Sequence, residues 1–153
     1  MSLVSKCVDT VASASNEFVI SGVDQVLHAC RWFRLDVPKA VFEFAQKNRS
    51  NVKSSKIEIR VFQELSKKID AIHDFWVENL ALPVDIYVSS KNLILQVDGI
   101  HHFYPNGEYH FRDVFTTKLL ERYGFRVVRL NFRDLYTSND VRITLSRIFP
   151  EFK

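Results

Sequence analysis

Residues 84–103 constrain the fold more than any other part of the chain, because they contain two alternating segments around a short polar turn. Apolar residues occupy every second position of residues 84–88 and of residues 93–97, which is the pattern of strands buried on one face. Ser-Ser-Lys-Asn separates the two segments and is typical of a turn. The sequence therefore predicts an antiparallel hairpin with one apolar face and one polar face.

The apolar positions also predict the register of this hairpin. If the four turn residues form the loop, Val88 pairs with Leu93, and the further pairs on that face are apolar as well. The same register sets Asp85 opposite Gln96, with Cβ atoms about 5 Å apart and Asp98 about 7 to 8 Å away on the diagonal. One cation could then contact more than one of these side chains. The alternative is that the three residues are simply the solvated side of a sheet.

The composition is that of a globular domain. With 46% hydrophobic and 25% charged residues, the 153-residue chain is neither disordered nor membrane-spanning. No apolar run approaches the roughly 18 to 20 residues that a bilayer requires, and residues 1–20 lack the pattern of a signal peptide. We therefore expect an intracellular or intraorganellar protein with no membrane contact. Cys7 and Cys30 are isolated from each other, and neither has a His at the usual ligand spacing, which argues against a zinc site or a disulfide framework.

The net charge of +3 permits a polyanionic partner without requiring one. Basic residues gather in two segments, with Arg49, Lys53, Lys56, Arg60, Lys67 and Lys68 in the first and Arg112, Lys118, Arg122, Arg126, Arg129 and Arg133 in the second. Either segment could contact a nucleic-acid backbone, or both could be ordinary solvated faces.

Before the hairpin, residues 17–44 follow a helical pattern that is interrupted near Asp36-Val37-Pro38. Pro38 suits the first turn of a second helix. Two short amphipathic helices resemble one unit of an α-solenoid, and they are either the tail of a helical-repeat array or a cap on the domain that follows. Residues 46–54 are polar and predict a hinge.

The remaining elements are expected in the order helix, three-strand meander, helix, strand and helix. They are a helix from Ser55, a strand near residues 74–78, the hairpin, a helix from Asp113 to Tyr123 ended by Gly124, a strand over residues 125–131 and a helix over residues 141–149.

This order resembles the core of the PD-(D/E)XK nuclease superfamily, because an acidic residue lies on the middle meander strand and a QxD triplet on the next. The segments VDIYV, LILQVDGIHHF and TTKLLERYGFRVVRLNFRDL resemble the RAP domain, an RNA-binding module abundant in apicomplexan proteins and similar to the very-short-patch repair endonuclease. The resemblance covers residues 84–136 closely. It implies an α/β, restriction-endonuclease-like fold in which residues 1–50 are a helical extension and residues 54–153 are the RAP, PD-(D/E)XK-like domain.

The resemblance also assigns roles to the polar face of the hairpin. Asp85 matches the superfamily's metal-binding aspartate and Gln96 the position of its glutamate, while Asp98 stands where typical members have lysine. These three residues would be the ligands of a Mg²⁺ ion. Gln96 brings no negative charge, and Asp98 cannot donate protons to a phosphate as an ammonium group can, so the chemistry of hydrolysis is in doubt.

Two helical residues could complete such a site. Glu58 matches the glutamate that many members contribute from the first helix, although Ser55-x-x-Glu58 is also a capping box that would turn this side chain back to its own helix. Lys118 could supply the missing cation from the second helix, or it could be an ordinary exposed lysine.

Residues that could contact nucleic acid surround the hairpin. Of the adjacent His101 and His102, at most one should face the site, because neighbouring residues point in different directions. The aromatic residues around them suit the stacking of unpaired bases, or they pack against the edge of the sheet. The candidate contacts are His101, His102, Tyr104, Arg112, Lys118, Arg122, Lys56 and Arg60.

Three functions fit these observations. The first is an RNA-binding domain on a nuclease-like scaffold, acting in RNA processing or stability, with RNA favoured over DNA. The second is a Mg²⁺-dependent endonuclease that cleaves RNA or structured DNA, and the third is a protein-interaction domain without nucleic-acid contact. In a eukaryote, the RAP resemblance implies a mitochondrial or plastid location.

Overall fold

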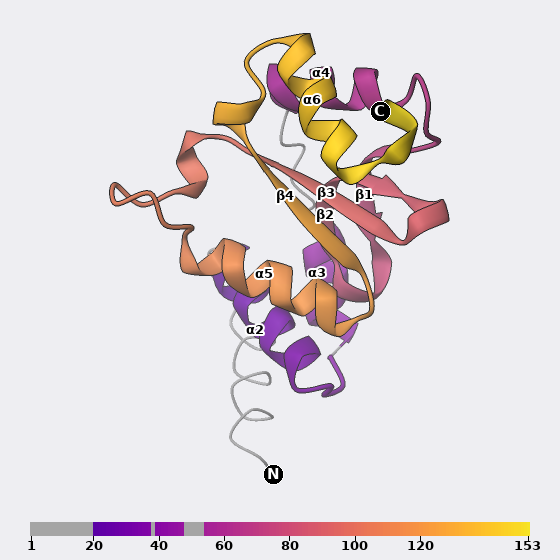
Figure 1. Ribbon diagram of the computed structural model, residues 1–153. Coiled ribbons are helices and arrows are strands. Elements are labelled where there is room, and N and C mark those ends of the chain that lie inside the picture. The colour runs from indigo at the N-terminus through magenta and orange to yellow at the C-terminus, as the bar shows by residue number, and fades with distance from the viewer. Residues whose placement is uncertain (1–19, 38, 48–53) are drawn as a thin grey trace. The chain divides into compact units, whose positions relative to one another are not determined.

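A computed structural model describes residues 20–37, 39–47 and 54–153 (Figure 1). Pro38, which we expected in the first turn of a second helix, lies outside these residues, as does most of the predicted hinge. The chain divides into two compact units, of which the first contains two helices and the connection Val77–Leu82, and the second contains most of the sheet and the helices around it. Among the described residues, no helix combines the length and apolarity needed to cross a bilayer.

The two helices of the first unit are α2 (Ile20–Trp32) and α3 (Lys39–Lys47). The chain leaves α2 through Arg34, which has a positive φ of 54°, so the predicted break between the helices is confirmed. Leu27 and Cys30 on α2 and Val41 on α3 are buried, as the helical spacing predicts. Cys30 is a free thiol whose pKa burial raises.

A single mixed sheet with strand order β1-β2-β3-β4 forms the centre of the second unit. Strands β2 and β3 are antiparallel, and β3 and β4 are parallel. The predicted element order is confirmed. In chain order the elements are α4 (Lys56–Leu65), β1 (Ile72–Val77), β2 (Leu82–Val88), β3 (Leu93–Asp98), α5 (Phe111–Arg122), β4 (Arg126–Asn131) and α6 (Ser138–Ile148).

The register of the hairpin is the one that burial of the apolar positions predicts. Val88 pairs with Leu93 and Ile86 with Leu95. The connection is a 3-10 turn ending at Asn92, which has a φ of 45° in the left-handed region. Asn is one of the few residues other than Gly that adopt this conformation at low cost, and here its side chain also donates to the Gly124 carbonyl, 2.8 Å away.

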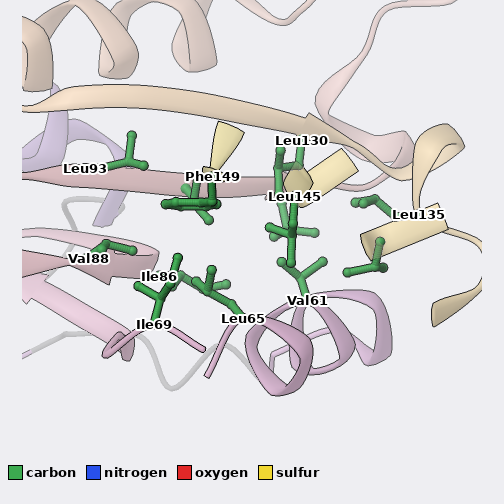
Figure 2. Close-up of a cluster of buried hydrophobic side chains, with 13 residues drawn as sticks. Val61, Leu65, Ile69, Ile86, Val88, Leu93, Leu130, Leu135, Leu145 and Phe149 are labelled. Atoms are coloured by element: carbon green, nitrogen blue, oxygen red, sulfur yellow. The ribbon is translucent and has the colours of Figure 1, made fainter. Parts of the chain in front are cut away.

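Helices α4 and α6 cover the apolar face of the sheet. Leu65 of α4 lies beside Ile86 of β2, and Val61 of α4 lies beside Leu145 of α6, within one buried cluster (Figure 2). The pairs between β2 and β3 on this face are apolar, so a one-residue slip of β2 would turn Asp85 toward the core. The opposite face of β3 and β4 lies against α5, and that face carries the polar residues.

Two helix starts differ from the sequence prediction. The prediction that Asp113 caps α5 is wrong, because the helix begins at Phe111 and the Asp113 carboxylate instead contacts Arg129 of β4 and His102, which follows β3. Helix α6 begins earlier than predicted, at Ser138, because Thr137 and Asp140 form a reciprocal capping box. Gly124 ends α5 as predicted, with a φ of 89° that favours glycine.

Candidate functional site

Asp85 and Gln96 join β2 to β3 through their side chains. The Asp85 backbone N–H donates to Gln96 Oε1 at 3.2 Å, and the Val97 N–H donates to Asp85 Oδ2 at 2.6 Å. The two side chains thus accept hydrogen bonds from backbone groups of the facing strand, next to the Ile86–Leu95 pair. Gln96 is buried, so its amide oxygen is engaged within the sheet rather than presented to solvent.

The surroundings of Asp85 disfavour its charged form. Burial raises the pKa of its carboxyl from 3.8 to about 7, and the negative charges of Glu58 and Asp98 act in the same direction. The hydrogen bond from the Val97 N–H and the His102 ring partly oppose this rise. Near neutral pH, Asp85 is therefore divided between its neutral and charged forms.

Asp98 lies at the end of β3 with 1% of its surface exposed, and its partner is Arg129. Arg129 Nε donates to Asp98 Oδ2 at 2.8 Å, and Arg129 Nη2 donates to Asp98 Oδ1, so the pair is bidentate. The parallel register places Arg129 beside Gln96 on β3, on the same face of the sheet. A guanidinium therefore occupies the polar face between the two strands.

Helix α5 completes the surroundings of this guanidinium. Arg129 Nη2 donates to Asp113 Oδ1 at 3.2 Å, and Nη1 donates to Thr117 Oγ1 at 3.1 Å and to the Asp113 carbonyl at 3.3 Å. The Tyr109 ring lies 5.2 Å from the guanidinium carbon. Every nitrogen of the side chain thus has a partner within the protein.

His102 also faces this cluster. Its Nδ1 lies 2.9 Å from Asp113 Oδ1 and 3.5 Å from Asp98 Oδ1, whereas the neighbouring His101 is exposed. One oxygen of Asp98, one of Asp113 and one nitrogen of His102 lie within 4.8 Å of one another, a spacing that a metal ion could bridge. Arg129 Nη2, however, donates to both carboxylates, so these residues do not fit a divalent cation as they stand.

Glu58 makes contacts with both its own helix and β1. Its Oε2 accepts from the Ser55 N–H at 3.3 Å while Ser55 Oγ accepts from the Glu58 N–H, which is the capping box that the sequence offered as an alternative. Its Oε1 lies 2.7 Å from Nε2 of His73, and His73 Nδ1 lies 3.5 Å from Asp74 Oδ2. Glu58, His73 and Asp74 form a second group with the spacing of metal ligands.

The other predicted site residues lie on the surface or have different partners. Lys118 is exposed on α5, and the cation that contacts the carboxylates is Arg129 on β4. Arg60 Nη1 donates to the carbonyls of Leu135 and Tyr136, which fastens α4 to the loop before α6. The remaining candidates for nucleic-acid contact, Lys56, His101, Tyr104, Arg112 and Arg122, are exposed.

Arg129, Asp113 and His73 were not among the predicted site residues. Arg129 appeared only as one member of a basic segment, and its alternation on the predicted strand did not say which strand it would pair with. Once β4 is known to pair with β3 in parallel, that alternation places Arg129 on the face of Gln96 and Asp98. Arg129 could not be assigned to the site because the sequence pattern did not show that β4 pairs with β3.

Comparisons with known proteins add a distant likeness. No protein-family model and no curated protein matches the chain. Among solved structures, the catalytic domain of the homing endonuclease I-Bth0305I aligns with 65% of this chain and 94% of its own, at 24% sequence identity and a TM-score of 0.47. A likeness of this strength does not establish a shared activity, and the proposals below depend on the residues of this chain.

Proposed function

We propose that residues 54–153 form a RAP-type nucleic-acid-binding domain, with RNA favoured over DNA, on a PD-(D/E)XK-like scaffold that has lost its metal site. The observation that carries this proposal is the buried ion pair between Arg129 and Asp98. It favours binding over cleavage because Arg129, rather than a metal ion, neutralises Asp98 on the polar face.

The charges around this ion pair make metal capture unfavourable. Magnesium in nucleases is held by carboxylate oxygens. Here Asp98 and Asp113 already accept hydrogen bonds from Arg129, Gln96 is neutral, and the pKa of Asp85 is about 7. Binding a divalent ion would require Arg129 to leave and Asp85 to lose its proton.

The exposed cations support contact with a polyanion. Lys118 and Arg122 lie one turn apart on α5, and Arg112 is exposed in the first turn of the same helix. Contacts between such side chains and phosphates bind nucleic acid with a strong dependence on salt. In its cellular role, we place the domain in RNA processing or stability, as the RAP resemblance implies.

Fluorescence anisotropy with labelled RNA and DNA, in EDTA and at a series of salt concentrations, tests this function. We expect saturable binding without metal, tighter binding to RNA, and a linear fall of log K with log salt. The absence of binding at low salt, or binding that does not respond to salt, would contradict the proposal and favour a protein-interaction domain.

A Mg²⁺-dependent endonuclease is the second candidate. Asp98, His102 and Asp113 have the spacing of metal ligands, and an active enzyme would require Arg129 to release the two carboxylates. Incubation of labelled RNA and structured DNA with Mg²⁺ or Mn²⁺ separates the two functions. Cleavage that Asp85→Ala abolishes would establish the enzyme, whereas binding without cleavage on every substrate supports the first proposal.

A further inference from the structure

Exposed apolar side chains recur in the part of the chain that follows β3. Ile100, Tyr104 and Phe111 have 64%, 46% and 74% of their surface exposed, and Val114 is exposed as well. Isolated exposed apolar residues are ordinary, but a group of them marks a surface that binds something. Ile100 and Tyr104 lie between β3 and α5, and Phe111 and Val114 lie at the start of α5.

Residues 103–109 form a small hairpin, and its aromatic rings have two different surroundings. Phe103 and Tyr109 pair across the hairpin with their rings 4.5 Å apart, and Tyr109 faces Arg129. Tyr104 is instead exposed, and its ring lies 4.4 Å from that of His110. The first pair packs against the candidate site, and the second presents a ring surface to solvent.

The short hairpin is held in one conformation by its own backbone. The Tyr104 N–H donates to the Glu108 carbonyl at 2.7 Å, and the Gly107 N–H donates to the Tyr104 carbonyl at 2.8 Å. Gly107 has a φ of 85°, which suits glycine. A ring on such a turn loses little further conformational freedom when it stacks on a ligand.

Cationic side chains follow these rings along the chain and on α5. Phe111 opens α5 and is followed directly by the exposed Arg112. Phe111, Lys118 and Arg122 share a helix face because they stand at positions i, i+7 and i+11. The nearby carboxylate of Glu108 accepts from the Asn106 amide at 2.9 Å, within the hairpin. Rings next to cations fit a ligand with flat faces and a negatively charged backbone.

We infer that Tyr104, His110 and Phe111 stack on unpaired bases of a single-stranded nucleic acid, while Arg112 and Lys118 contact its phosphates. This inference rests on the proposed nucleic-acid binding and adds the class of ligand. Exposed aromatic rings bind single strands because every unpaired base offers a free face, whereas bases in a duplex already stack on each other.

The test compares a single-stranded RNA, its duplex, and a strand of the same length in which abasic sugars replace the central bases. We expect Phe111→Ala and Tyr104→Ala each to weaken binding of the single strand by roughly 5- to 100-fold, and Phe111→Trp to retain it. The loss should disappear on the abasic strand, which keeps its phosphates but has no base to stack.

Phe33→Ala is the matched control, because Phe33 is an aromatic residue with 65% exposure that follows α2. It should leave the affinity unchanged, and thermal melts should show that all the variants remain folded, since each removes an exposed ring. Equal binding of single strand and duplex, with no effect of Phe111→Ala, overturns the stacking surface and leaves the proposed function standing. No binding to any oligonucleotide overturns both.

Discussion

Asp98 and Asp85 lie on neighbouring strands of one sheet and on the same polar face, yet they have opposite surroundings. Asp98 is almost fully buried and forms a bidentate ion pair with Arg129. Within the described residues, no cationic side chain forms an ion pair with Asp85, whose carboxylate accepts from the Val97 N–H. The pKa of Asp85 consequently rises to about 7.

This difference shows how two carboxylates on one polar sheet face can both lose net negative charge by different routes. A cation from the next strand neutralises one carboxylate, and burial promotes protonation of the other. Both changes reduce the negative charge that a divalent ion requires, while the strands and their register keep the arrangement. Four experiments test this difference between Asp98 and Asp85.

Replacing Arg129 should have the largest effect. Arg129→Met leaves Asp98 buried without its partner, and we expect the free energy of unfolding to fall by about 3 to 5 kcal/mol in urea denaturation. Arg126→Met on the same strand is the control, because Arg126 is exposed and its loss should change stability by less than about 0.5 kcal/mol. Equal effects of the two substitutions would mean that Asp98 does not depend on the ion pair.

Asp85 should make the protein less stable as the pH rises. Its folded pKa of about 7 lies above its ordinary value of 3.8, so its stabilising contribution is full below about pH 4 and is lost as the pH rises through 7. The side chain introduced by Asp85→Asn stays neutral at every pH. At pH 8 the variant's free energy of unfolding, measured in urea, should exceed that of the wild type by on the order of a few kcal/mol.

At pH 5 that advantage should be smaller, and the exposed Asp70→Asn should reproduce the wild-type pH dependence. A wild type and an Asp85→Asn variant with parallel stability profiles between pH 5 and 8 would show that the Asp85 carboxyl is ionised throughout.

Glu58 should contribute a smaller amount through its two sets of contacts. Ser55→Ala removes one half of the capping box and should cost about 1 kcal/mol. Glu58→Ala also removes the contact with His73, so its cost should reach about 1 to 3 kcal/mol. Because the Glu58 charge raises the pKa of Asp85, Glu58→Gln should lower that pKa in an NMR titration. An unchanged midpoint of the Asp85 titration would show that the Glu58 charge does not act on the Asp85 carboxyl.

Lys118 should matter least for stability, since it is exposed on α5. Lys118→Ala should change the free energy of unfolding by less than about 0.5 kcal/mol, yet reduce the slope of log K against log salt for RNA by about one. Arg147→Ala on α6, which packs on the other face of the sheet, should leave the slope unchanged. A slope that Lys118→Ala leaves intact would remove Lys118 from the nucleic-acid contacts.

Much of the fold could be predicted because it depends on local patterns. The alternation in residues 84–97 predicted the register of β2 and β3, since this pairing sets the alternating apolar residues of both strands on one buried face. The helix caps at Ser55 and Gly124 were likewise predictable from neighbouring residues. The start of α5 was not, because the Asp113 carboxylate contacts distant side chains rather than the nearby backbone.

By itself, then, the sequence determined the hairpin, its register and the presence of Asp85, Gln96 and Asp98 on one face, because a strand's side chains alternate with a fixed period. The tertiary structure alone decided that Arg129 neutralises Asp98, while none of the cationic side chains that the structure describes forms an ion pair with Asp85. That decision depends on β4 pairing with β3 and on α5 packing above them, which bring together residues that are distant in the chain. Charge and protonation follow from such contacts, and no local pattern records them.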